Sequence, residues 1–75
     1  MHNTWHSLNV QYWDARNAVT QAVLEQRLDE DEAFRIKLSM RDILQAAATD
    51  EQQADALAAF NSVTAKYRGS ANVEN

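Results

Sequence analysis

Residues 4–28 read TWHSLNVQYWDARNAVTQAVLEQRL and contain the longest helical pattern in the chain. Apolar side chains recur in this segment at steps of three and four residues, the spacing that gathers them on one face of an α-helix. The members of this stripe are Trp5, Leu8, Tyr12, Ala15, Val19 and Ala22. The pattern predicts one continuous helix from about residue 4 to residue 28.

Two more helices are predicted after this segment. The chain has no proline, and its single glycine, Gly69, lies near the C-terminus, so the usual residues of turns and hairpins are missing from its interior. The acidic run DEDE at residues 29–32 interrupts the apolar pattern. Because acidic side chains are favourable at a helix N-terminus, this run predicts a second helix over residues 30–47.

The third helix is predicted from a capping signal. Thr49 is followed three residues later by Gln52, which is the form of a capping box and predicts a helix over residues 50–67. Gly69 is placed to end this helix with a left-handed cap, and residues 69–75 are expected to form a tail. Away from its larger apolar residues, the predicted third helix carries Ala54, Ala58 and Ala65. These small side chains form a face suited to close helix packing.

These elements predict an all-α fold, a small antiparallel bundle of two to three helices completed by dimerisation, with residues 1–75 in a single domain. The run DEDE alone does not break a helix, so two topologies stay open. One is an up-down-up bundle of three helices. In the other, the first two helices are continuous and form one long rod, and the helices pair between chains. Dimerisation is expected because 13 of the 34 apolar residues are alanine, which leaves 21 larger apolar side chains for the core. For a chain this short, apolar burial and the entropy cost of ordering nearly cancel.

Apolar residues also occur outside the main stripes. Val10, Trp13, Leu24 and Leu28 form a second line along the first helix, while Phe34 and Leu38 project to a different side of the second helix. Tryptophan and tyrosine are enriched in binding hot spots, and Trp5, Tyr12 and Trp13 fall within nine residues. The residues predicted to form a dimer or partner interface are therefore Val10, Trp13, Leu24, Leu28, Phe34, Leu38 and Trp5. The alternative is that three mutually packed helices bury these side chains in one core.

The composition excludes several classes of function. Without cysteine, the chain has no disulfide, thiolate metal site or cysteine nucleophile, and without an early glycine it has no glycine-rich phosphate loop. His2 and His6 have the spacing of a shared metal site, but no third ligand follows, and we interpret them as part of an exposed polar N-terminus. No cofactor, metal or catalytic residue is predicted, and the protein is expected not to be an enzyme.

The sequence predicts a small protein-binding module that regulates or inhibits a protein partner, forms a homodimer, and is of the kind that phages and mobile elements encode. A small domain without disulfides fits the cytoplasm, and the lack of a long apolar run predicts no membrane span. A net charge of -4 opposes nucleic-acid binding. The alternative is a nucleic-acid-linked module, either an RNA-binding helical hairpin dimer or an acidic decoy that uses residues 29–32.

Overall fold

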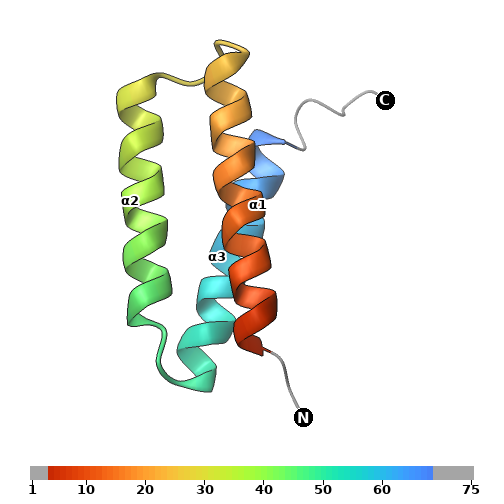
Figure 1. Ribbon diagram of the computed structural model, residues 1–75, viewed down its shortest axis with the longest axis vertical. Helices are drawn as coiled ribbons and strands as arrows, with labels where there is room; N and C mark the ends of the chain where they lie inside the picture. The colour runs from red at the N-terminus through yellow and green to blue at the C-terminus, as the bar shows by residue number, and fades with distance from the viewer. Residues whose placement is uncertain (1–3, 69–75) are drawn as a thin grey trace.

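The computed structural model describes residues 4–68 and consists there of three α-helices (Figure 1). They are α1 (Thr4–Leu24), α2 (Glu30–Ala46) and α3 (Asp50–Tyr67). Consecutive helices run in opposite directions and are joined by short turns, so the predicted all-α bundle is confirmed in its three-helix form. The predicted cap at Gly69, the tail at residues 69–75 and His2 lie outside the described residues.

The first helix is shorter than predicted, because α1 ends at Leu24 and not at residue 28. The backbone N–H of Arg27 donates to the carbonyl of Ala22, and that of Gln26 donates to the carbonyl of Val23. This pair of bonds is the Schellman motif, which requires a left-handed residue after the helix, and Gln26 has φ 62°. The helix therefore ends without the glycine that usually marks such an end, and a rod continuous with α2 is ruled out.

The acidic run forms the start of α2, as predicted. Asp29 is the N-cap, and its Oδ2 accepts a hydrogen bond of 2.9 Å from the backbone N–H of Asp31. Glu30, Asp31 and Glu32 occupy the first turn, where the partial positive charge of the helix end stabilises carboxylates. Asp31 and Arg35 have the i, i+4 spacing that favours an ion pair on a helix, but they do not form one. The ion pair recorded among residues 4–68 joins Arg27 to Glu25 in the turn before α2.

The predicted capping box at the start of α3 is confirmed. Thr49 Oγ1 accepts a hydrogen bond of 3.0 Å from the backbone N–H of Gln52. Gln52 Oε1 accepts in return from the backbone N–H of Thr49 at 3.1 Å and from that of Ala48 at 2.9 Å. Three backbone donors thus find partners at the corner between α2 and α3.

Replacing Thr49 with alanine is expected to lower the free energy of unfolding by about 1 kcal/mol, because the Gln52 N–H loses its acceptor. Urea unfolding followed by far-ultraviolet circular dichroism measures this change. Thr49→Ser keeps the hydroxyl oxygen and is the matched control, which should retain most of the stability. Equal unfolding midpoints for the wild type and Thr49→Ala would contradict a stabilising role for the cap.

The core is built on α1, which packs most extensively against α3 and less against α2. Its buried residues are Leu8, Tyr12, Ala15, Ala18, Val19 and Ala22, which include five members of the predicted stripe. Phe60 from α3 and Met40 from α2 complete the centre. The sixth member of the stripe, Trp5, is exposed, because it lies in the first turn of α1 at the edge of the stripe.

Two predicted helix faces are corrected by the packing. Ala54, Ala58 and Ala65 of α3 face solvent, whereas Ala56 of α3 is buried, as are Ala15, Ala18 and Ala22 of α1. On α2, Ile43 follows Ile36 and Met40 at helical spacing, which predicts that it faces the core, but it is 38% exposed, whereas Ala33 is buried. The molecule measures 39 × 29 × 15 Å, so it is flat, and no helix among residues 4–68 covers one broad side of α1 and α2 (Figure 1).

Candidate interaction surface

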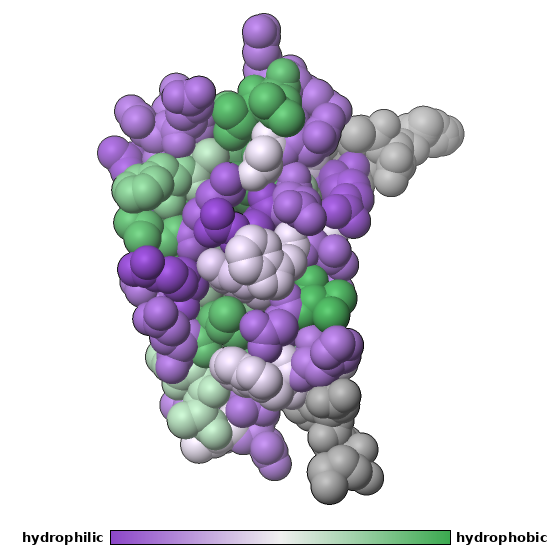
Figure 2. Space-filling view, viewed as in Figure 1, coloured by the Kyte–Doolittle hydropathy of each residue, from purple (hydrophilic) through white to green (hydrophobic). Residues whose placement is uncertain are grey.

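Large apolar side chains remain exposed on the open side of α1 and α2. Trp5 is 52% exposed, Trp13 55%, Phe34 64% and Leu24 71%. Figure 2 shows this side, with apolar groups separated by hydrophilic ones over both helices. Four large apolar side chains exposed on one side of a small protein make that side the candidate interaction surface. We call this surface the α1–α2 face and define it by Trp5, Trp13, Arg16, Thr20, Leu24, Glu30, Phe34, Lys37 and Arg41.

Leu24 and Phe34 line one groove of about 310 Å³ between α1 and α2. Its floor contains buried Ala33 and half-buried Val23. Across the groove, Lys37 Nζ donates a hydrogen bond of 2.7 Å to Thr20 Oγ1, which fixes how the two helices lie against each other. The structure therefore brings together two predicted interface residues from different helices.

Trp13 is exposed but held in one orientation. Its ring lies edge-on to Tyr12, with 5.4 Å between centroids and 79° between planes. The guanidinium of Arg16 lies 5.3 Å from the centre of the Trp13 ring, within the range of a cation–π contact. Tyr12 is itself buried and lies edge-on to Phe60, so the indole is joined to the core through Tyr12.

Three cations, Arg16, Lys37 and Arg41, lie on the α1–α2 face. The hydrogen bond between Lys37 and Thr20 sets the alignment of the antiparallel helices α1 and α2. Arg16 lies about one turn before Thr20 on α1, and Arg41 lies about one turn after Lys37 on α2. Both arginines are therefore displaced from that bond in the same direction. Neither arginine makes an ion pair within the described part of the chain. Their neighbours at three and four residues along each helix are uncharged or basic: Tyr12, Trp13, Val19 and Thr20 around Arg16, and Lys37, Leu38, Leu44 and Gln45 around Arg41. Lys37 and Arg41 are like charges one turn apart on α2, which is an unfavourable pair.

The other predicted interface residues lie elsewhere. Val10 is exposed but turned towards α3, where it lines a second groove with Leu57 and Asn61. Leu28 follows the end of α1 and is half-buried against the core, and Leu38 is half-buried on α2. Sequence reasoning missed the basic cluster, because Arg16 and Arg41 become neighbours only when α2 folds back along α1.

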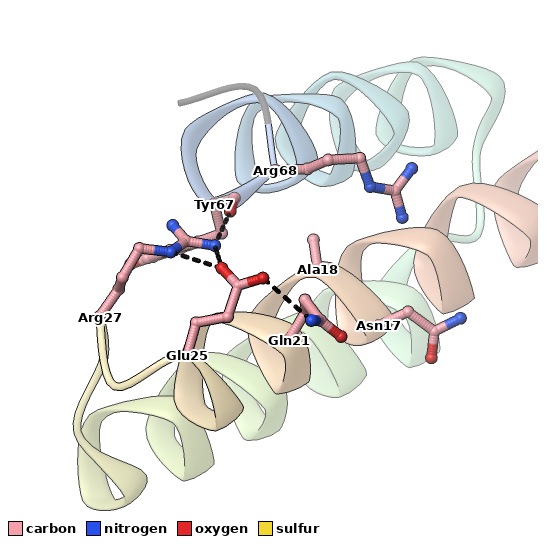
Figure 3. Close-up of a pocket in the computed structure, with 7 residues that line it drawn as sticks. All are labelled: Asn17, Ala18, Gln21, Glu25, Arg27, Tyr67 and Arg68. Atoms are coloured by element: carbon pink, nitrogen blue, oxygen red, sulfur yellow. Dashed lines mark hydrogen bonds and ion pairs between the residues drawn. The ribbon is translucent and has the colours of Figure 1, made fainter. Parts of the chain in front are cut away.

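A separate pocket of about 320 Å³ lies where the end of α1 meets the end of α3 (Figure 3). Glu25 accepts hydrogen bonds from Gln21 Nε2 at 3.0 Å and from Arg27 Nε at 2.9 Å. Arg27 Nη2 also donates to the Tyr67 carbonyl at 2.9 Å, which ties the α1–α2 turn to α3. The Gln21 amide and the Arg27 guanidinium hold the pKa of Glu25 below its usual range. The charged groups here hold the turn in place.

The described part of the chain contains no group of three histidine, aspartate or glutamate side chains that could share a metal ion. His6 is exposed on α1, and its predicted companion His2 lies outside that part. None of the three helices described combines the length and hydrophobicity that crossing a membrane requires. The chain matches no protein-family model, no curated protein and no solved structure at a significant level.

Proposed function

We propose that this protein is a small non-enzymatic module that binds a protein partner through the α1–α2 face and thereby regulates or inhibits that partner. The observation that carries the proposal is Trp13, which is 55% exposed yet held by Tyr12 and Arg16. An aromatic ring that is already ordered loses little conformational entropy on binding, and tryptophan and arginine are enriched in hot spots. Trp5, two turns before Trp13 on α1, extends the aromatic surface.

The pocket at the end of α1 does not have the chemistry of a general acid. Its carboxylate, Glu25, has a lowered pKa, whereas a general acid working near neutral pH needs a raised one. Glu25 is also engaged by Gln21 and Arg27, which belong to the same small hydrogen-bond network. These hydrogen bonds give the site a structural role, because Arg27 links Glu25 to the carbonyl of Tyr67 on α3.

Replacing Trp13 with alanine is expected to weaken partner binding by about 30-fold or more, the loss that follows removal of a hot-spot tryptophan. The measurement is affinity capture from a lysate of the source organism, followed by the dissociation constant for the captured protein. Val10→Ala is the matched control, since Val10 is exposed on the same helix but turned towards α3. Circular dichroism of both variants establishes that the fold is kept. Equal capture by Trp13→Ala and wild type would contradict the proposal.

The alternative function, nucleic-acid binding, is favoured by one observation, the cluster of Arg16, Lys37 and Arg41 beside an exposed indole. Exposed aromatic rings and cations together bind single strands. The net charge of -4 and the carboxylate of Glu30 on the same face oppose it. Quenching of tryptophan fluorescence by added RNA, lost steeply as salt rises, would favour this alternative over a protein partner.

We also propose that the module is a homodimer. Among residues 4–68, six of the eleven buried apolar residues are alanine, and the larger buried side chains there are Leu8, Tyr12, Val19, Met40 and Phe60. A core this small gains from the additional apolar burial that association provides. Sedimentation equilibrium tests this proposal, and a monomer at every concentration up to hundreds of micromolar would contradict it.

A further inference from the structure

We infer that the partner protein contributes an acidic amphipathic helix, which lies along the α1–α2 face. The carboxylates of that helix meet the cations of the face, and its apolar side chains enter the groove that Leu24 and Phe34 line. This inference rests on the proposed function and names the chemistry of the partner segment. It is carried by the uneven distribution of charge over the chain.

Positive charge is concentrated on this face. The chain has seven lysines and arginines and eleven aspartates and glutamates, which gives a net charge of -4. Three of the seven cations, Arg16, Lys37 and Arg41, belong to the face as defined above, against one carboxylate, Glu30. None of these three cations is part of an ion pair among residues 4–68. A surplus of positive charge on one face of an acidic protein attracts an acidic partner and repels a basic one.

A helix is the type of segment that fits this face. On α1, Trp13, Arg16, Thr20 and Leu24 recur at steps of three and four residues, so they lie along one side of the helix. Trp13 and Leu24 are eleven residues apart, which is three turns and about 16 Å. Residues 4–68 contain no strand, so an extended segment finds no sheet edge there for its backbone groups. A helix of three to four turns bonds its own backbone and covers the open side of α1 and α2, opposite α3 (Figure 1).

The order of groups along α2 specifies the partner helix further. Arg41 lies seven residues from Phe34, which is two turns and about 10 Å, and Lys37 lies between them. Lys37 donates one hydrogen bond to Thr20, and its ammonium has two further N–H groups. Carboxylates one turn apart on the partner helix therefore meet Arg41 and Lys37, and an apolar residue one turn further on meets Phe34. Glu30 lies one turn beyond Phe34 in the same direction, so we expect no acid at that end of the partner helix.

Arg16 is held in place by the aromatic rings beside it. Its guanidinium carbon lies 5.3 Å from the centre of the Trp13 ring and 6.0 Å from the centre of the Tyr12 ring. A guanidinium that lies over aromatic rings still presents its N–H donors in a rigid fork that matches a carboxylate. Trp13 thus supports a carboxylate-binding group besides offering its own apolar surface.

A protein helix fits the face better than a nucleic-acid strand does. A strand carries a phosphate at every nucleotide, so it would set negative charge over the apolar groove and against Glu30 as well as on the arginines. A protein helix can confine its carboxylates to the part that meets the cations. The apolar groove and the basic cluster are then both satisfied by one segment.

Selection from a random peptide library tests this inference on the full-length protein. The displayed peptides are about 16 residues long, enough for four helical turns, and are selected on the immobilised protein. Enriched peptides are expected to carry two or more aspartates or glutamates one turn apart, with an aliphatic or aromatic residue one turn further on. Enriched peptides that lack acidic residues or carry lysine and arginine in their place would overturn the inference, as would a selection that enriches no peptide.

Charge variants then locate a synthetic peptide of the enriched sequence. Arg16→Gln with Arg41→Gln should raise its dissociation constant about tenfold or more, measured by titration of tryptophan fluorescence. The matched control is Arg35→Gln with Lys66→Gln, which removes two exposed positive charges outside the face and should change the constant less than about twofold. Circular dichroism establishes that both variants are folded. Equal affinity of the wild type and the Arg16, Arg41 variant would contradict the inference, as would displacement of the peptide by a lower concentration of single-stranded RNA than of free peptide.

The outcomes separate this inference from the proposed function. If Trp13→Ala loses the captured partner while the Arg16, Arg41 variant binds that partner as the wild type does, the acidic helix is overturned and the proposed function stands. If Trp13→Ala captures the partner as the wild type does, both are overturned. Loss of capture in both variants, with the control variant unaffected, supports both.

Discussion

Replacing Phe60 with alanine is expected to cost about 3–5 kcal/mol, the largest loss of stability that a single truncation should cause in this protein. Phe60 is fully buried, lies in the core between α1 and α3, and is edge-on to Tyr12 at 5.6 Å between ring centroids. Its removal leaves a cavity that the backbone of three short helices can only partly close. A domain of this size has a total stability of roughly 5–10 kcal/mol, so the variant should be largely unfolded on mild heating.

Thermal and urea unfolding at one low protein concentration measure this loss, because association would otherwise add its own stabilisation. Phe34→Ala is the matched control, with the same chemical change at a side chain that is 64% exposed. It should shift the unfolding midpoint little. Phe60→Leu keeps most of the buried volume and should fall between the two. Similar losses for Phe60→Ala and Phe34→Ala would mean that the core is not centred on Phe60.

Enlarging Ala15 to leucine is expected to destabilise the fold by about 1–3 kcal/mol, because the added carbons have no space between α1 and its neighbours. Ala15 is fully buried in the core cluster, on the helix that packs most extensively against α3. Alanine and leucine differ little in helix propensity, so the loss reports packing alone. The free energy of unfolding from urea titration measures it.

Ala58→Leu is the matched control for this change. Ala58 lies within α3 but faces solvent, so the same enlargement there should alter stability by less than about 0.5 kcal/mol. This comparison also tests whether the close helix contact is made by buried alanines such as Ala15 and not by the solvent-facing alanines of α3. A larger loss at Ala58 than at Ala15 would restore the face of Ala54, Ala58 and Ala65 as the packing face.

The starts of α2 and α3 were predictable because their causes are local. Asp29 and Thr49 accept hydrogen bonds from backbone groups two and three residues away, and such contacts depend only on nearby residue types. The end of α1 was not predictable in the same way. Its left-handed residue is Gln26, which carries no glycine signal, and the neighbouring Arg27 is held by the carbonyl of Tyr67 from the far end of the chain.

Residue spacing alone therefore determined the helical class, the helix starts and the stripe that α1 buries, since helical periodicity and capping act within a few residues. The candidate surface needed the tertiary structure. Leu24 meets Phe34, and Arg16 lies near Arg41, only because α2 folds back along α1 in the alignment held by Lys37 and Thr20. Whether an apolar side chain such as Trp5 or Ile43 is buried depends on whether a neighbouring helix covers it. The helices of residues 4–68 form a flat arrangement, in which none of them covers one side of α1 and α2.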